Sequence, residues 1–169
     1  MTECVIVGRP RVGKTTLFVK LCAMYGKRVP GGIERCELSV ARGRRGVTQF
    51  SLVDTIGLVP WIPSDPTKRS QLAQALQALA SAGLVLHVVS AVSVERGFNG
   101  TESGIDLLLY RYASLHKRYL VACNKMDLPG AATGFKSLCK IVGTSSVVPI
   151  VAASGSGLKK LVQRLAGLV

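Results

Sequence analysis

The sequence predicts an α/β fold, in which a mostly parallel sheet carries helices on both faces and so forms three layers. Strand-like and helical patterns alternate along the chain, as they do in such sheets. Two runs, Leu84–Val89 and Tyr119–Cys123, are almost entirely apolar, which is typical of parallel strands that are buried on both sides. Because 169 residues give room for one sizeable core, we expect a single domain over residues 1–169 without an accessory domain.

The individual elements follow from the spacing of apolar residues and from the turn residues between them. Strands are expected at 3–8, 34–42, 47–53, 84–90, 119–124 and 147–152. Helices are expected at 14–25, 70–82, 102–115, 134–141 and 157–168. Three segments that contain Pro, Gly and Ser are expected to be mobile loops, at 26–33, 57–69 and 91–101. We interpret His87, which lies inside an apolar strand, as a hydrogen-bonded core residue.

Cysteine usage and hydropathy bear on where the protein works. The five cysteines have no CxxC spacing, and most lie in apolar runs, where a free cysteine acts as a small buried hydrophobe. We therefore expect a reducing, cytoplasmic location, and the N-terminus shows no export signal. No charged residue occurs from Ser70 to Val94, but recurring glutamines and Gly83 divide this run into helix, turn and strand, so we expect no integral membrane segment.

The formal net charge of +13 predicts an anionic partner or ligand. Nucleotide, RNA and an anionic membrane surface all satisfy this, and charge alone does not choose between them. The densest basic cluster, Arg42, Arg44 and Arg45, lies at the tip of the predicted hairpin, where it either contacts phosphates or is solvated. A second cluster, His116–Arg118, either adds to such a surface or complements a helix dipole.

The stretch Gly8–Thr15 fits the pattern GxxxxGK[ST] and lies between a predicted strand and a predicted helix. At such a turn the backbone N–H groups converge on a phosphate, and the helix dipole adds favourable potential. Lys14 is expected to reach the β- and γ-phosphates, and the Thr15 hydroxyl to ligate Mg²⁺. The expected nucleotide contacts of this loop are Gly8, Arg11, Val12, Gly13, Lys14, Thr15 and Thr16.

A second motif, Asp54-Thr-Ile-Gly57, ends the predicted strand at 47–53. In a phosphate-binding protein of this kind, a carboxylate at such a strand end can hold Mg²⁺ directly or through water. The N–H of a glycine three residues later can bond the γ-phosphate. Loss of that phosphate would release Gly57 and the loop 57–69 behind it, which makes this loop a candidate switch.

A third motif, Asn-Lys-Met-Asp at 124–127, predicts that the base is guanine. The Asp127 carboxylate can accept hydrogen bonds from both the N1–H and the exocyclic amine of guanine, a donor pair that adenine lacks. Asn124 is expected to tie this loop to the base and to the phosphate loop, while the aliphatic stem of Lys125 covers the base. The expected base contacts are Asn124, Lys125, Asp127, Ala152 and Ala153, the last two through backbone N–H groups near guanine O6.

These three motifs, in this order over nearly the whole chain, resemble those of the translation-factor-related GTPases. Gly8–Thr15 is similar to the GRPNVGKS of the Era/TrmE-like branch of that group. The resemblance implies the P-loop GTPase fold, with a six-stranded sheet whose second strand is antiparallel. It also implies Mg²⁺-dependent binding of GTP and GDP, with slow hydrolysis gated by a partner. The family roles fall on Lys14, Thr15, Asp54, Gly57, Asn124, Lys125, Asp127 and Ala152.

Two departures from that branch concern the switch loops. The branch usually has a threonine in the first switch that caps Mg²⁺ and the γ-phosphate, but none occurs from Pro30 to Arg35, and Thr48 lies inside a predicted strand. After Gly57 stands Leu58, where Ras-like relatives have the glutamine that orients the attacking water. The sequence therefore offers no obvious water-positioning side chain.

A third departure lies in the phosphate loop, where Arg11 replaces the asparagine associated with potassium-assisted hydrolysis in that branch. This arginine either acts as a finger that stabilises the transition state, points to solvent, or pairs with an acid such as Asp65. The candidate catalytic residues are Lys14, Arg11 and Gly57, and the candidate metal ligands are Thr15 and Asp54.

Three functions remain open from the sequence. The first is a GTP/GDP-binding switch whose loops 26–33 and 57–69 pass the nucleotide state to a protein partner, with Trp61 either contacting that partner or folded back over the adjacent helix. The second is an RNA- or ribosome-associated GTPase that uses the basic hairpin tip. The third is a nucleotide-binding interaction module with negligible hydrolysis, since the switch threonine and the glutamine are both missing.

Overall fold

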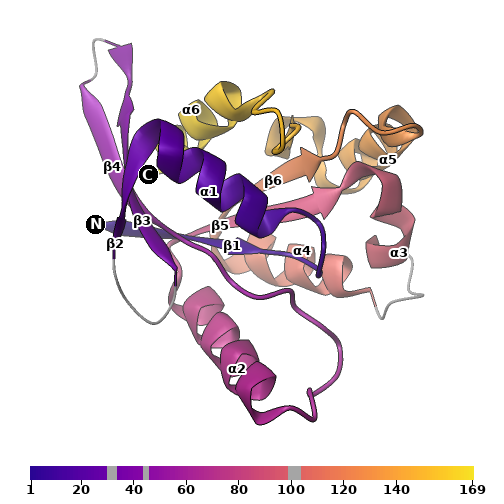
Figure 1. Ribbon diagram of the computed structural model, residues 1–169. Helices are drawn as coiled ribbons and strands as arrows, with labels where there is room; N and C mark the ends of the chain where they lie inside the picture. The colour runs from indigo at the N-terminus through magenta and orange to yellow at the C-terminus, as the bar shows by residue number, and fades with distance from the viewer. Residues whose placement is uncertain (30–33, 44–45, 99–103) are drawn as a thin grey trace.

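The computed structural model describes residues 1–29, 34–43, 46–98 and 104–169 (Figure 1). Within these ranges the strands form one seven-stranded sheet in the order β2-β3-β4-β1-β5-β6-β7. Strands β1, β4, β5, β6 and β7 are parallel, whereas β3 runs antiparallel to both of its neighbours. The strands are β1 Thr2–Val7, β2 Gly26–Val29, β3 Arg35–Ala41, β4 Val47–Val53, β5 Leu84–Ser90, β6 Arg118–Asn124 and β7 Val147–Pro149. The α/β fold with a mostly parallel sheet is confirmed.

The prediction of six strands is wrong by one, because part of the expected loop 26–33 is the edge strand β2, which pairs with β3. The sequence hides this strand, since Gly-Lys-Arg-Val has one apolar residue and its pairing is a tertiary contact. Helix α1 ends at Tyr25 and the chain enters β2 at once. A side chain at Gly26 would collide with the carbonyl of Glu37 on β3, so only glycine allows this sharp entry. Residues 30–33 lie outside the described residues.

Each predicted helix is present, but the one expected at 134–141 begins at Ala131, and residues 102–103 of the one expected at 102–115 lie outside the described residues. Two predicted loops are partly helical. The helices are α1 Lys14–Tyr25, α2 Pro66–Ser81, α3 Val94–Phe98, α4 Ile105–His116, α5 Ala131–Val142 and α6 Leu158–Leu168, with short 3-10 turns η2 Ala91–Ser93 and η3 Thr144–Ser146. Helix α2 begins at Pro66 and not at 70, because the Asp65 carboxylate caps it by accepting the amide of Lys68 at 3.0 Å. The predicted loop 91–101 is wrong over 91–98, which is helical.

The sheet is covered on both faces, so the three expected layers are present (Figure 1). On one face, Ile6 of β1 packs in a core with Leu17 of α1 and Leu161 of α6. On the other face, Val5 packs in a core with α2 and with Leu109 of α4. A third cluster, between β5, β6, α3 and α5, continues that second face toward the far edge of the sheet.

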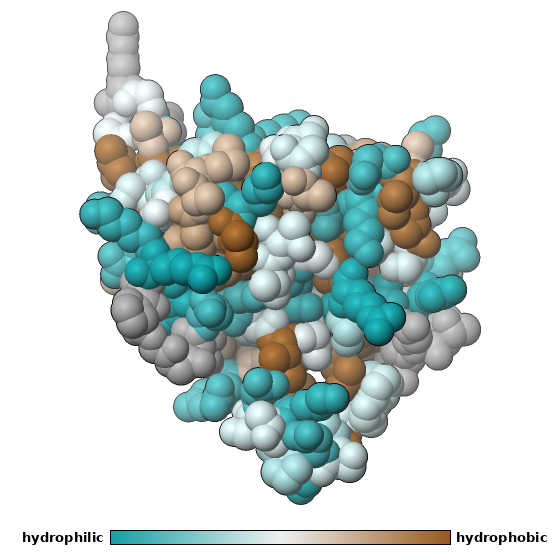
Figure 2. Space-filling view, viewed as in Figure 1, coloured by the Kyte–Doolittle hydropathy of each residue, from teal (hydrophilic) through white to brown (hydrophobic). Residues whose placement is uncertain are grey.

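The surface and the cysteines fit a folded domain with an internal core. All five cysteines are free thiols, and four of them are buried. On the face that Figure 2 shows, hydrophilic side chains are widespread and hydrophobic ones form separate patches among them. Across the described ranges, no helix has both the length and the hydropathy that crossing a bilayer requires.

Candidate nucleotide-binding site

The loops that carry the sequence motifs all leave the carboxyl ends of parallel strands. The phosphate loop follows β1, the Asp54–Gly57 segment follows β4, the tetrad at 124–127 follows β6, and the segment 150–157 follows β7. Because β1, β4, β5, β6 and β7 are parallel, these ends lie at one edge of the sheet. In open α/β sheets this edge is the usual place for a ligand.

Two glycines give the phosphate loop its shape. Gly8 and Gly13 have φ angles of 144° and 101°, a region that side chains other than glycine rarely adopt. A side chain at Gly8 would collide with the carbonyl oxygen of Val88, and one at Gly13 would collide with the amide of Asn124. The backbone therefore passes directly against β5 and the base-side tetrad before it enters α1 at Lys14.

One cavity of about 540 Å³ brings together the predicted phosphate-binding groups from two loops. The residues lining it include Arg11, Gly13, Lys14, Thr15 and Thr16 from the phosphate loop and Gly57 from the segment after β4. A side chain at Gly57 would lie 2.6 Å from the Pro10 Cα, so the two loops are in direct contact there. This contact is what would let a terminal phosphate touch both loops at once.

Lys14 is 6% exposed, and its ammonium donates to the backbone carbonyl of Arg9 at 2.8 Å. Burial lowers the pKa of Lys14 to about 8, although the nearby Asp54 and Asp106 act in the opposite direction. A lysine placed this way is a cation whose charge is incompletely compensated. The phosphates of a nucleotide would supply that compensation.

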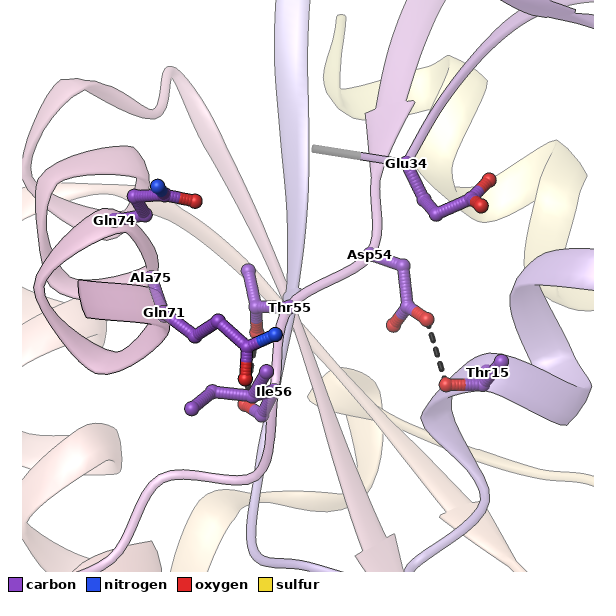
Figure 3. Close-up of a pocket in the computed structure, with 8 residues that line it drawn as sticks. All are labelled: Thr15, Glu34, Asp54, Thr55, Ile56, Gln71, Gln74 and Ala75. Carbon is purple, nitrogen blue, oxygen red and sulfur yellow. Dashed lines mark hydrogen bonds between the residues drawn. The ribbon is translucent and has the colours of Figure 1, made fainter. Parts of the chain in front are cut away.

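The predicted metal ligands lie next to each other. The Thr15 hydroxyl donates to Asp54 Oδ2 at 2.7 Å, beside a cavity of about 210 Å³ (Figure 3). The other carboxylate oxygen, Asp54 Oδ1, is buried and has no hydrogen-bond partner among the described residues. Burial raises the pKa of Asp54, while the Thr15 hydroxyl and then Lys14 act to lower it. An unpaired carboxylate oxygen beside a hydroxyl fits a Mg²⁺ ion, which takes few protein oxygens and completes its shell with water and phosphate.

Glu34 lines the same cavity, and the sequence analysis did not identify it (Figure 3). Its backbone carbonyl accepts the amide of Asp54 at 3.0 Å, so it lies directly beside the predicted metal ligand. Its charge also acts to raise the pKa of Asp54. The only signal in the sequence is an acid at the end of the first switch segment, which no motif contains.

The segment after β4 is anchored to β1 and to the phosphate loop. The Thr55 hydroxyl donates to the carbonyl of Ile6 at 2.6 Å, and the amide of Leu58 donates to the carbonyl of Gly8 at 3.0 Å. The Leu58 side chain is 2% exposed and packs in the core beneath α2. It therefore takes no part in orienting water at the phosphates, as the sequence implied.

Asn124 joins the base-side loops to the phosphate loop. Its side chain is buried; Nδ2 donates to the carbonyl of Val12 at 2.8 Å and Oδ1 accepts the amide of Ala152 at 2.9 Å. The predicted tie to the phosphate loop is present. Because the amide of Ala152 already bonds to Asn124, its predicted contact with guanine O6 requires sharing or exchange of that bond, and Ala153 is the exposed neighbour.

The remaining base-side residues, Lys125 and Asp127, lie on the loop after β6. Lys125 has a φ of 65°, and its ammonium donates to the carbonyl of Arg11 at 2.9 Å, so its stem spans from the base-side loop to the phosphate loop. Asp127 is exposed at the same edge of the sheet. The amide of Met126 donates to the carbonyl of Ile150, which joins the loops after β6 and β7.

The sequence also assigned other roles to several arginines and to a tryptophan. Arg11 is exposed with a φ of 62°, and within the described residues no ion pair joins it to Asp65, whose carboxylate caps α2. Trp61 is 63% exposed, so most of this residue is open to solvent. Arg42 lies at the described base of the hairpin turn, whereas Arg44 and Arg45 lie outside the described residues.

A buried polar network behind the phosphate loop was missed by the sequence analysis. Arg9 Nε donates to Asp106 Oδ2 at 2.7 Å, and His87 lies 2.9 Å from Asp106 Oδ1 and 2.7 Å from the Tyr119 hydroxyl. His87 and Asp106 are fully buried, which confirms His87 as a hydrogen-bonded core residue. His87 and Arg9 hold the pKa of Asp106 below its usual range, although burial alone would raise it. The network links the phosphate loop to β5, α4 and β6.

Comparison with known proteins gives one family and several relatives. The chain matches the family described as "50S ribosome-binding GTPase" over residues 3–125. GTPase Der of Bordetella pertussis is 34% identical over 167 residues, which cover 97% of this chain and 35% of that protein. The chain thus spans about a third of the length of the curated relatives it matches.

Two solved structures share the fold. Era of Aquifex aeolicus bound to GDP.AlF4⁻ has a TM-score of 0.73 and 24% identity, and the match covers 99% of this chain and 56% of that one. Era in complex with MgGDPNP and nucleotides 1506–1542 of 16S ribosomal RNA has a TM-score of 0.76 and 23% identity, with the same two coverages. Both confirm the predicted α/β architecture.

Proposed function

This chain belongs to the family described as 50S ribosome-binding GTPase, and we propose that residues 1–169 form a GTP-binding domain that acts as a molecular switch. It binds GTP and GDP with Mg²⁺ and hydrolyses GTP slowly to GDP and phosphate. Its switch loops differ between the GTP and GDP states, and a partner recognises that difference. The observation that supports this proposal most is the single cavity that collects Lys14, Thr15 and Gly57, beside the hydrogen-bonded pair Thr15–Asp54. We place the protein in the cytoplasm, where its free buried cysteines stay reduced.

The phosphate loop does most of the binding in this mechanism. The backbone N–H groups at the start of α1 and the ammonium of Lys14 surround the β- and γ-phosphates. Thr15 and Asp54 would hold Mg²⁺, which neutralises charge on the phosphate oxygens when it is bound. The amide of Gly57 bonds the γ-phosphate, so this contact exists only in the GTP state.

The readout of the nucleotide state follows from the same geometry. Gly57 lies against Pro10, and the chain continues through Leu58 and Trp61 to α2. Loss of the γ-phosphate removes one anchor of this segment, while the bond between the Leu58 amide and the Gly8 carbonyl is unaffected. The switch segments are 26–33 and 57–69, of which 26–29 form strand β2 and 66–69 form the start of helix α2. Since Leu58 is buried, hydrolysis is slow unless a partner supplies a water-positioning group.

The experiment that tests this function is nucleotide competition combined with single-turnover hydrolysis. We expect GTP and GDP to displace a fluorescent guanine nucleotide and ATP to fail, because Asp127 selects the donor pair of guanine. We also expect slow hydrolysis that requires Mg²⁺. Equal affinity for ATP and GTP would contradict the base assignment, and no hydrolysis at saturating Mg²⁺ would favour an interaction module over a GTPase. Affinity capture should be done twice, with protein loaded with a non-hydrolysable GTP analogue and with protein loaded with GDP. A protein captured by only one of the two forms is a partner that recognises that nucleotide state.

A second candidate function is RNA or ribosome association, supported by the net charge of +13 and by the Era structure that holds 16S ribosomal RNA. We predict that changing Arg42, Arg44 and Arg45 together to Glu abolishes RNA binding and spares GTP binding. For a duplex, the slope of log affinity against log salt should become shallower by about 0.9 for every phosphate that the protein no longer neutralises. If the wild-type protein binds neither RNA nor anionic lipid vesicles at low salt, these arginines do not bind phosphates, and the alternative of a solvated basic cluster holds.

A further inference from the structure

Two adjacent cavities lie along the segment that follows Gly57. One cavity of about 440 Å³ lies between the phosphate loop, this segment and η2–α3, and another of about 330 Å³ lies between α2 and α4. The two cavities share Leu58, Val59 and Ile105 in their walls, so they are adjacent, and we call the two together the switch groove. Helices α2 and α4, which line the switch groove, lie on the same face of the sheet (Figure 1).

The α2–α4 end of the switch groove is apolar. Its walls include Leu72 and Leu76 on α2 and Leu108 and Tyr112 on α4. Three of these side chains are open to solvent: Leu108 is 55% exposed, Leu76 51% and Tyr112 40%. Side chains four apart on a helix share one face, so each helix presents an apolar stripe to the groove. An exposed apolar groove between two helices is a common docking site for an amphipathic helix.

The phosphate-loop end of the switch groove is cationic. The charged side chains that line the groove are Arg9, Arg11, Arg96 and Lys125. Arg9 is held inside the protein by Asp106, whereas Arg11 and Arg96 are exposed. Among the residues that the structure describes, no acidic side chain lines either cavity.

The two helices that flank the apolar end carry the same sign of charge. Helix α2 has two basic residues, Lys68 and Arg69, and no acid. Helix α4 has Arg111, and its one acid, Asp106, is fully buried in the network behind the phosphate loop. The exposed charge that these two helices carry is therefore positive, which favours a partner rich in carboxylates.

We propose that the switch groove binds an amphipathic helix of a protein partner, with its apolar stripe between α2 and α4 and an acidic end against Arg96. The apolar end gives a nucleic acid nothing to bind, and a groove between helices does not fit a flat lipid surface. This inference rests on the proposed function. Leu58 and Val59 follow Gly57 directly, so the shape of the groove would depend on the nucleotide.

Two synthetic peptides test this pairing of charge and shape. Both are helix-forming peptides of about 18 residues, or five turns, with the same leucine stripe and no tryptophan. One carries glutamates on its polar face and at one end, and the other carries lysines in the same places. Trp61 is the only tryptophan of the chain and lines the groove, so its fluorescence reports binding there. With protein loaded with a GTP analogue, we expect the glutamate peptide to bind at least about tenfold more tightly than the lysine peptide.

A matched pair of variants on α4 tests the place of binding. Leu108→Glu puts a charge into the apolar end, whereas Leu115→Glu makes the same change at a 79% exposed position of the same helix that does not line the groove. We expect the first to weaken binding of the glutamate peptide at least about tenfold and the second by less than about twofold. Arg96→Glu should weaken the glutamate peptide and strengthen the lysine peptide.

The affinity for GTP, measured in parallel, separates failure of this inference from failure of the proposed function. If GTP binds and the two peptides bind equally, or Leu108→Glu has no effect, the proposed occupant is wrong. The proposed occupant is also wrong if a short RNA duplex displaces the glutamate peptide equally well from the wild type and from Leu108→Glu, because RNA would then bind the groove without using its apolar end. If GTP itself does not bind, the proposed function fails.

Discussion

The two halves of the nucleotide site differ in how completely the protein itself satisfies their polar groups. In the base half, the Asn124 side chain is hydrogen-bonded at both ends, to Val12 and Ala152. In the phosphate half, Asp54 Oδ1 has no partner among the described residues, and Lys14 bonds to the backbone of its own loop. The base half is therefore preorganised by the protein at Asn124, whereas the phosphate half has polar groups that a nucleotide and Mg²⁺ would complete. Base selection should then depend on fixed geometry, and phosphate binding on charge and pH.

The largest effect is expected from Asp127→Asn, which changes the base half without touching the phosphate half. Replacing the carboxylate by an amide removes two charge-assisted acceptors for guanine, each worth about 1.5–3 kcal/mol. We expect GTP affinity to fall by orders of magnitude and affinity for xanthosine nucleotides to rise, because the amide N–H suits their C2 carbonyl. Competition binding with GTP and XTP measures both. A variant that keeps its preference for GTP over XTP would place base recognition elsewhere.

A smaller loss is expected from Lys14→Ala in the phosphate half. The change removes a 6% exposed cation from the cavity in which we expect the negative oxygens of the phosphates to bind. We expect both GTP and GDP to lose at least about tenfold in affinity, since one charge-assisted hydrogen bond is worth about 1.5–3 kcal/mol. Calorimetry measures the loss, and the Lys20→Ala variant on the same helix, outside the cavity, is the control. Unchanged affinity in Lys14→Ala would exclude this loop as the phosphate site.

The same lysine gives phosphate binding a pH dependence that base recognition should lack. Burial lowers the pKa of Lys14 from 10.5 to about 8, so the free protein loses this charge as pH rises through about 8. Phosphate favours the charged form, so binding takes up a proton above that pH and affinity falls. Between pH 7 and 9 we expect about a tenfold loss of GDP affinity in the wild type. Lys14→Ala, measured over the same range, should show only the pH dependence of the nucleotide itself, and identical profiles would contradict this origin.

The sequence predicts the site more completely than it predicts the edges of the fold, and the reason is physical. Residues 8–15, 54–57 and 124–127 are local patterns whose chemistry requires fixed spacing, and the parallel sheet brings them to one edge. Strand β2 has no local pattern, because four residues with one apolar side chain form a strand only by pairing with β3. Helix α3 also has a weak local pattern, because Gly97 lies within it and glycine disfavours a helix.

Side chains that interact over long sequence separations were also beyond prediction. Arg9 and Asp106 are 97 residues apart, and neither stands out alone in the sequence. What could have pointed to Asp106 is that an acid on an apolar helix and a histidine in an apolar strand both need buried partners. A side chain at Gly97 would collide with Asp106, so this glycine is explained by the network and not by a turn. The switch groove likewise depends on helix packing that no local pattern encodes.

The smallest expected effect concerns Arg11, which lies in the phosphate half of the site and bears on hydrolysis and not on binding. Arg11 stands where the Era/TrmE-like branch has an asparagine that helps to hold potassium against the phosphates. A guanidinium has no acceptor with which to ligate a cation, so hydrolysis should be equal in potassium and in sodium within about twofold.

Arg11→Asn tests whether the loop can still hold the ion. The position has a φ of 62°, which asparagine tolerates better than arginine, so this variant should fold at least as well as the wild type. If the loop can complete the shell of the ion, Arg11→Asn should gain a potassium response.

Arg11→Ala tests whether the arginine stabilises the transition state as a finger or only points to solvent. A finger acts only as charge develops, so its loss would slow single-turnover hydrolysis while GDP affinity stays nearly constant. A wild-type protein that hydrolyses GTP clearly faster in potassium than in sodium would show that the loop holds the ion despite Arg11.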